Sequence, residues 1–371
     1  MLDLNGFYYM FLPYQSFDDG SLQFGVVCKR TYRIAHGERA RADEAQLPLF
    51  TADVYWEETE PLLSSLKHEA DNVPCKPKTD VVVNARAYAP GGQPVEQMTV
   101  AVDVEGVARK EILVVGDRFC TQPGGLTPSF SYPLPFDEMP LRYEYAYGGI
   151  DPEAAPGGGL PFPKNPVGTG FALGGPNAGP SVDGMPLPNL EDPRDRLTPE
   201  RILVPHDRLL ETPQPAGFGW YGKGWLPRAA KAGVPRASRA LWAEAHDFAG
   251  IEARGGEVRE LDAEFFNGAS PGLVLPLLRG DEWLALHGMD RTGLCRFQLP
   301  CEGVRVALDL CKEGLRQVPM RLTTVAVLRE EDRLYQCWSG SVSYASNETL
   351  WDKGIGKIVI EPVEVAAAPG A

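Results

Sequence analysis

Apolar and polar residues alternate along several short segments of this chain. The clearest segment is 98–104, where Met or Val occupies every second position, and Glu105-Gly106 separates it from a second apolar segment at 107–115. Such alternation is typical of a strand that is buried on one face, and a glycine turn between two such strands predicts a β-hairpin. Further strands are predicted at 22–34, 79–88, 304–310, 322–328 and 334–342.

The strand predicted at 22–34 carries three basic residues near its end. They are Lys29, Arg30 and Arg33. We expect all three side chains to face out of the sheet.

Few segments show helical spacing. The best is 237–253, which has an apolar face, Ser238 as a candidate cap and Gly255-Gly256 as its end. A shorter helical pattern lies between Glu57 and Ala70, with Pro61 near its start. Because most strands follow one another without an intervening helix, the sheets are expected to be antiparallel.

A segment rich in glycine and proline divides the chain. Residues 151–227 contain 13 Gly and 15 Pro, a density that excludes long helices and central strands. A disordered linker is one interpretation, but large apolar residues recur through the segment, and their burial favours an ordered structure. The sequence therefore predicts a mainly β protein with two antiparallel β-rich lobes, at 1–150 and 236–365. They are joined by an ordered Gly/Pro-rich platform at 151–235, and 366–371 forms a flexible tail.

Composition limits the possible partners. The 371 residues carry a net charge of −14, which argues against a nucleic acid or an anionic membrane as a partner. No apolar run is long enough to span a bilayer, and the first residues lack the basic start and cleavage pattern of a signal peptide, so a cytoplasmic location is expected. The seven cysteines form no C-x-x-C pair, which favours free thiols over disulfides or a zinc site.

No motif predicts catalysis, a cofactor or a bound metal. Residues 217–222 fit G-x-G-x-x-G as a string, but the prolines around them do not allow the strand and helix that a dinucleotide site needs. The five histidines are scattered, and no nucleophile elbow or P-loop is present. Carboxylates offer acid/base pairs in principle, but we interpret them as ion-pair or turn ligands: Asp117, Glu144, Asp151, Glu191 and Asp192.

Aromatic residues in and near the Gly/Pro-rich segment have two interpretations. Filling of the core is favoured for each of them, and an anchor patch for a protein partner is the functional alternative. The set comprises Tyr143, Tyr145, Tyr147, Phe162, Phe171, Trp220, Tyr221 and Trp225.

A series of short motifs in a fixed order gives the chain a family resemblance over roughly residues 1–345. The motifs are Lys76 to Val83, Ala87-Tyr88-Ala89-Pro90, Gly116-Asp117-Arg118, Met139-Pro140-Leu141, Tyr143-Glu144, Gly148-Gly149, Asn165-Pro166, Gly168, Gly170-Phe171, Leu187 to Pro193, Phe265-Phe266-Asn267 and Leu322 to Val325. In these the chain resembles a bacterial family of unknown function, numbered twenty-one sixty-nine. It departs from the family pattern at Asn84, Cys120 and Thr323, and 236–260 matches poorly.

The resemblance implies a function in type VI secretion. Members of the family are associated with effector adaptors or chaperones. The resemblance implies that this chain binds a toxic effector protein, with the spike or its tip as a further candidate partner, and needs no cofactor or reaction. Two alternatives stay open. One is a β-fold hydrolase or carbohydrate-active enzyme with carboxylates in a central cleft, and the other is a structural component of the apparatus.

The candidate residues for partner binding or for the platform lie mainly in the quoted motifs. They are Asp117, Arg118, Tyr143, Glu144, Tyr147, Gly148, Gly149, Asn165, Pro166, Phe171, Asn189, Asp192, Trp220 and Trp225.

Overall fold

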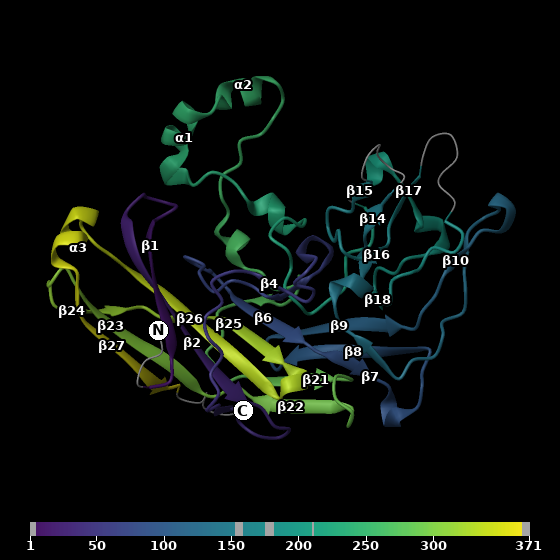
Figure 1. The fold of residues 1–371 in the computed structure, drawn as a ribbon, viewed down its shortest axis with the longest axis horizontal. Coiled ribbons are helices and arrows are strands. Elements are labelled where there is room, and N and C mark those ends of the chain that lie inside the picture. Colours follow the sequence, from purple (N-terminus) through teal and green to yellow (C-terminus); the bar gives the residue numbers. More distant parts are fainter. Residues whose placement is uncertain (1–4, 153–158, 175–181, 210, 366–371) are drawn as a thin grey trace.

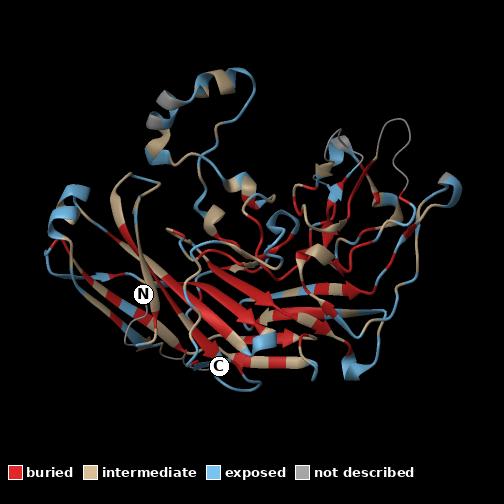
Figure 2. Cartoon of the chain, in the orientation of Figure 1, coloured by how far each residue is buried: buried red, intermediate tan, exposed pale blue. Residues whose placement is uncertain are grey.

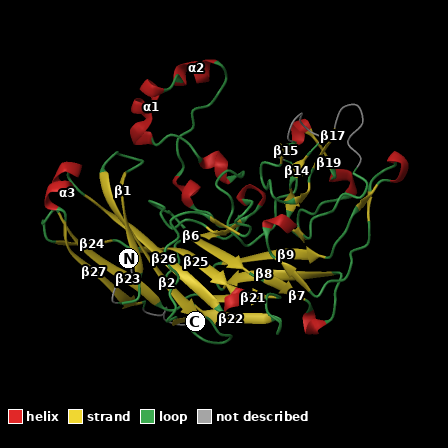
Figure 3. Ribbon diagram, in the orientation of Figure 1, coloured by secondary structure: helices red, strands yellow, loops and turns green. Residues whose placement is uncertain are grey.

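Strands dominate the fold, and helices are few and short (Figures 1 and 3). The structure is a computed structural model that describes residues 5–152, 159–174, 182–209 and 211–365. The predicted flexible tail, 366–371, lies outside these residues, as do parts of the predicted platform. The mainly β prediction, with several antiparallel sheets, is confirmed.

The largest sheet has seven strands. Its order is β1-β2-β26-β25-β6-β20, and β3 pairs with β2 beside this path. The strands are β1 (Tyr8–Gln15), β2 (Leu22–Arg33), β3 (Arg41–Ala42), β6 (Thr79–Asn84), β20 (Val274–Leu275), β25 (Arg321–Leu328) and β26 (Arg333–Ser343). All pairs are antiparallel except β6 with β25, which is parallel.

A five-stranded sheet contains the predicted hairpin. Its order is β18-β9-β8-β21-β22. The strands are β8 (Gln97–Val104), β9 (Ala108–Val115), β18 (Leu190–Glu191), β21 (Trp283–His287) and β22 (Leu294–Gln298). Gly106 has a φ of 76° in the turn between β8 and β9, a conformation that glycine adopts without strain.

A three-stranded antiparallel sheet and several two-stranded ones complete the fold. The first has the order β24-β23-β27, with β23 (Glu302–Leu310), β24 (Leu315–Val318) and β27 (Ile355–Glu364), and the helix α3 (Asn347–Lys353) precedes β27. The small pairs are β4 (Val54–Tyr55) with β5 (Leu66–His68), β7 (Arg86–Tyr88) with β12 (Glu138–Pro140), and β10 (Cys120–Thr121) with β11 (Ser129–Phe130).

The two large sheets take strands from both ends of the chain. In the seven-stranded sheet, β6 lies between β25 and β20, and in the five-stranded sheet β8 pairs with β21. One continuous cluster of buried apolar side chains runs through all three larger sheets, and Figure 2 shows the buried positions concentrated along their strands. The division predicted at residues 150 and 235 therefore does not coincide with the division into sheets.

The Gly/Pro-rich segment forms short strand pairs over a core of its own. The pairs are β13 (Tyr147–Gly148) with β16 (Thr169–Gly170), β14 (Ile150–Asp151) with β15 (Leu160–Pro161), and β17 (Ala172–Gly174) with β19 (Leu203–Pro205). A second buried cluster, which includes Tyr147, Phe162 and Phe171, lies beneath them. The apolar residues that recur through the segment are therefore buried, as an ordered platform requires.

Two helix predictions need correction. Between Glu57 and Ala70 only the turn Pro61–Leu63 is helical. Residues 66–68 form the strand β5 and not a helix, because their backbone pairs with β4. The helix predicted at 237–253 is broken into α1 (Arg239–Ala245) and α2 (Phe248–Ala253). The break lies at His246 and Asp247, where the Asp247 side chain accepts a hydrogen bond from the Gly250 N–H and starts a new helix.

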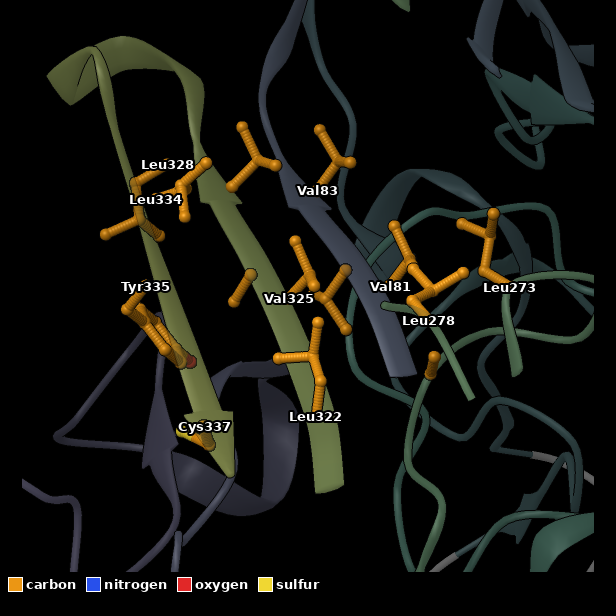
Figure 4. Packing of buried hydrophobic residues seen from close by; sticks show 14 of the residues in the cluster. Val81, Val83, Leu273, Leu278, Leu322, Val325, Leu328, Leu334, Tyr335 and Cys337 are labelled. Carbon is orange, nitrogen blue, oxygen red and sulfur yellow. The ribbon is translucent and has the colours of Figure 1, made fainter. Parts of the chain in front are cut away.

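The centre of the seven-stranded sheet is packed with aliphatic side chains. Figure 4 shows Val81 on β6, Leu322 and Val325 on β25, and Tyr335 and Cys337 on β26. All six positions of β6 are buried. Its three consecutive valines, 81–83, are typical of a strand that is covered on both faces, whereas Thr79, Asp80 and Asn84 at its ends are polar.

Lys29 is the main error in the strand predictions. It was expected to face solvent, but its side chain is fully buried, with the ammonium 2.9 Å from the Asp71 carboxylate. The ammonium also lies 3.6 Å from the ring centroid of Phe50 and 4.1 Å from that of Tyr335. A counter-ion and two aromatic faces thus replace the water that this charge loses.

Removal of the buried cation should destabilise the fold strongly. We expect Lys29→Met to lower the free energy of unfolding by about 3 to 5 kcal/mol, because the Asp71 carboxylate would stay buried without its cation. The matched control is Lys223→Met, whose partner Asp53 is partly exposed and whose own side chain is 40% exposed; a loss of only about 0 to 1 kcal/mol is expected there. Urea unfolding measures both, and equal losses would contradict the assignment.

His68 should make stability depend on pH. Its ring stacks on Phe50, with centroids 4.3 Å apart, and burial, followed by the charges of Lys29 and Lys67, lowers its pKa from 6.5 to about 3. Between pH 3 and 6.5 His68 is therefore protonated in the unfolded chain but neutral in the folded chain. The stability that neutral His68 contributes is complete above pH 6.5 and is lost as the pH falls towards 3.

The pH effect can be isolated with one variant. Between pH 6.5 and 5.5 the wild type should lose about 1 kcal/mol of unfolding free energy through His68, and His68→Gln should remove that part of the loss. Urea unfolding at a series of pH values measures it. An unchanged slope in the variant would show that His68 does not titrate in this way.

Candidate functional site

Asn165 joins the start of the Gly/Pro-rich segment to its middle. Its side-chain amide donates to the backbone carbonyl oxygens of Tyr143 (2.8 Å) and Tyr147 (3.1 Å). The backbone carbonyl of Asn165 accepts from the Gly149 N–H at 2.9 Å. A Cβ on Gly148 would lie 2.1 Å from that carbonyl oxygen. Gly148, Gly149 and Asn165-Pro166 therefore belong together as a backbone junction, in which the close approach requires glycine.

Arg118, Asp117 and Asn189 form a second junction. Arg118 donates to the Pro188 carbonyl at 2.9 Å and to the Glu191 carboxylate at 3.1 Å. Asn189 donates to the Val115 carbonyl and, at 2.9 Å, to the Asp117 carboxylate. Asp117 and Arg118 are adjacent in sequence, but each contacts a residue some 70 positions further along the chain.

Glu144 accepts structural hydrogen bonds from a distant segment, and Asp192 accepts one within its own turn. Glu144 accepts hydrogen bonds from the Ser65 N–H (2.6 Å) and the Ser65 hydroxyl (2.7 Å). Arg142 does not pair with it but lies 3.7 Å from the ring centroid of Trp56. Asp192 accepts from the Arg194 N–H at 2.9 Å, as a turn ligand does.

Most of the aromatic set fills the core. Tyr143, Tyr221 and Trp225 meet edge to face, with centroids 5.3 to 5.4 Å apart. Tyr147, Phe162, Phe171 and Trp220 are each at most 4% exposed. Side chains buried this deeply do not offer an anchor patch on the surface of the folded protein.

The glycines of the G-x-G-x-x-G string make room for these rings. A Cβ on Gly217 would lie 2.6 Å from the Tyr143 ring, and one on Gly222 would lie 2.7 Å from the Trp225 ring. Burial raises the pKa of Tyr143 well above its usual range, so its hydroxyl stays neutral. The string is an aromatic-rich turn, as the flanking prolines indicated.

Four charged side chains form a buried cluster that the sequence reasoning did not identify as a site. Lys76 lies 2.7 Å from the Asp80 carboxylate and 3.3 Å from that of Glu69, and Arg228 lies 2.6 Å from Glu69. Their side chains are at most 7% exposed. Burial opposes the charge of Lys76, but Asp80 and Glu69 together raise its pKa above the usual value.

Two family motifs meet at this cluster. Asp80 accepts hydrogen bonds from the Asn267 side chain (3.1 Å) and from the N–H groups of Gly268 (2.9 Å) and Ala269 (3.2 Å). Lys76 to Val83 and Phe265-Phe266-Asn267 were quoted separately in the sequence. Nothing in their positions along the sequence predicts that the two motifs lie side by side in the fold.

An open pocket of about 240 Å³ lies beside the cluster. Lys78 and Lys231 stand at it and share one carboxylate, that of Glu264. Hydrogen bonds from Lys231 and then from Lys78 lower the pKa of Glu264, which keeps it ionised. Tyr221, Pro227, Arg228, Asn267, Ala269, Pro271 and Val274 complete the lining.

An exposed apolar arm, defined here as residues Phe119 to Leu134, projects beyond the platform. Its large exposed side chains are Phe119 (44%), Leu126 (68%), Tyr132 (91%) and Leu134 (58%). The arm carries β10 and β11, and Figure 1 places β10 at the opposite end of the molecule from β1 and α3. The Cys120 N–H donates to the Met185 carbonyl at 2.8 Å, which ties the base of the arm to the platform.

Comparisons define the class of protein only coarsely. The fold is that of a β-rich protein in which distant segments meet at a buried ion cluster. Residues 19–339 match the model of a family described as "Uncharacterized protein conserved in bacteria (DUF2169)", and the chain belongs to that family. No curated protein and no solved structure matches the chain. Within the described residues, no helix is both long and apolar enough to cross a membrane.

The packing role of Gly217 can be tested with a neighbouring glycine as the control. We expect Gly217→Ala to reduce the free energy of unfolding by about 1 to 3 kcal/mol, because its methyl group would press on the buried Tyr143 ring. Gly224→Ala has no atom within 4 Å of the added Cβ and should be close to neutral. Thermal and urea unfolding compare the two, and a neutral Gly217→Ala would refute the packing role.

Proposed function

We propose that this protein is a cytoplasmic adaptor or chaperone of a type VI secretion system, which binds a toxic effector protein and helps to load it onto the secretion spike. The family resemblance is the reason for naming this system. The exposed apolar arm is the observation that supports binding of a protein partner. No cofactor or chemical reaction is part of this proposal.

The arm has the properties of a protein-binding surface. Contact between water and four large apolar side chains on one surface segment is unfavourable. Burial of these side chains by a partner therefore favours binding. Aromatic anchors such as Tyr132 and Phe119 commonly supply most of the affinity of an interface. Large apolar side chains such as Leu62 and Trp351 are also exposed elsewhere, but the arm carries four of them between residues 119 and 134.

Hydrogen bonds hold the arm in place before a partner binds. The Leu134 N–H donates to the Asp117 carbonyl at 3.0 Å, and the Leu187 N–H donates to the Arg118 carbonyl at 3.0 Å. The Gln122 N–H donates to the Asp183 carboxylate at 2.7 Å. Because the arm is already positioned, less conformational entropy is lost on binding. The predicted residues Asp117, Arg118 and Asn189 thus act as supports for the arm and not as contacts to the effector.

The proposal predicts that the arm is needed for effector loading. In the native host, replacement of Phe119, Leu126, Tyr132 and Leu134 by alanine should reduce co-purification of the effector at least about tenfold, since each anchor contributes on the order of 2 kcal/mol. Secretion of that effector should fall with it. Quantitative mass spectrometry of the purified complex and of the culture medium measures both.

A control of the same chemistry is available at the other end of the molecule. Trp351 on α3 is 87% exposed and Leu315 on β24 is 51% exposed. Alanine at both positions should leave effector binding and secretion unchanged. If the host secretes every effector normally without this protein, or if the control impairs loading as much as the arm variant does, the proposal is wrong.

A further inference from the structure

The pocket lined by Lys78 and Lys231 has an excess of positive charge in an acidic protein. Arg228, on its wall, is neutralised by Glu69 at 2.6 Å. Among the residues that the structure describes, the two lysines share one carboxylate, that of Glu264, and their side chains are 41% and 33% exposed. Within this part of the chain, one positive charge is therefore left without a counter-ion at the pocket. A ligand with a single negative charge would neutralise it.

Asn267, one of the residues that line the pocket, carries an unsatisfied acceptor. The Asn267 amide nitrogen donates to the Lys78 carbonyl at 2.9 Å and to the Asp80 carboxylate at 3.1 Å, which fixes the orientation of the side chain. Its Oδ1 atom is buried and has no hydrogen-bond partner among the described residues. A hydrogen bond from a ligand N–H to a buried acceptor of this kind would favour binding of that ligand.

The rest of the pocket is apolar. Tyr221, Pro227, Ala269 and Val274 contribute hydrocarbon surface next to the charged groups. A matching ligand therefore combines one anion, one nearby N–H and one apolar group. The last residue of a polypeptide has all three, because its carboxylate, its amide N–H and its side chain branch from the same carbon atom.

We propose that this pocket binds the free C-terminal carboxylate of a protein partner whose last residue is apolar. The carboxylate pairs with Lys78 and Lys231, the terminal amide N–H donates to Asn267, and the last side chain packs against Tyr221 and Val274. This proposal deepens the proposed function, on which it rests for the kind of partner, since it names a chemical feature by which an adaptor holds its cargo.

Charge and shape distinguish this ligand from other anions. Inorganic phosphate carries between one and two negative charges at neutral pH, more than the one unpaired cation, and it offers neither an N–H for Asn267 nor an apolar group. A fatty acid has the carboxylate and the hydrocarbon but no N–H for Asn267. Because the two lysines are partly exposed, salt should weaken the binding of any of these anions.

The test uses a defined peptide and the whole protein. The probe is N-acetyl-alanyl-alanyl-leucine, and calorimetric titration compares its free acid with its C-terminal amide. We expect the acid to bind saturably with a Kd of about 1 mM or tighter, and about tenfold more tightly than the amide. Sodium octanoate and inorganic phosphate should each bind more weakly than the acid.

Three variants locate the site. Lys78→Gln with Lys231→Gln should abolish the preference for the acid over the amide, whereas Lys223→Gln, on another partly exposed ion pair, should not change it. Glu264→Gln removes the resident counter-ion, so it should tighten binding of the acid about tenfold or less. A purely structural role of this ion triad predicts the opposite, namely weaker binding. Melting temperatures show that each variant is folded.

The outcomes that overturn the inference are separate from those of the effector experiment. Equal affinity for acid and amide, no saturable binding of the acid at millimolar concentration, or weaker binding by Glu264→Gln would each refute it. Tighter binding of octanoate or phosphate would refute it in favour of that anion. None of these measurements needs the effector or the arm. Normal effector loading in the arm variant would count against the proposed function alone, and equal affinity for acid and amide would count against this inference alone.

Discussion

The buried carboxylate of Asp80 needs hydrogen-bond donors, and this requirement fixes much of the surrounding structure. Its donors are Lys76 from four residues away and Asn267, Gly268 and Ala269 from a distant part of the chain. Asp80 lies on β6, which pairs in parallel with β25 at the centre of the largest sheet. The same charges that hold β6 therefore also position the segment that lines the lysine pocket.

A buried ion cluster of this kind restricts conformation as much as it stabilises. Desolvation of Glu69, Lys76, Asp80 and Arg228 is unfavourable, and it is offset only when each charge meets its partners in good geometry. Arg228 meets this condition through Glu69 and through the carbonyl oxygens of Tyr221 and Phe265. The turn that carries Trp220 to Arg228 is thus held against the sheet by charge as well as by aromatic packing.

The two proposed binding surfaces are attached to different parts of the structure. The apolar arm extends from the platform through the junction of Arg118 and Asn189, whereas the lysine pocket adjoins the ion cluster. In the proposed adaptor, the rigid interior would keep the arm and the pocket in place while each surface contacts a different part of a partner. Most of the predicted site residues are buried in the interior.

The sequence by itself determined the elements whose cause is local. The hairpin of β8 and β9 follows from alternating side chains and a glycine turn, and the small core of the Gly/Pro-rich segment follows from its recurrent apolar residues. Tertiary structure decided the rest. Lys29 is buried because Asp71, Phe50 and Tyr335 surround it, and 66–68 is a strand because β4 pairs with it. The same holds for the meeting of Lys76 to Val83 with Phe265 to Asn267. Hydrogen bonds and ion pairs between distant segments leave no periodic pattern in either segment, so only the folded chain reveals them.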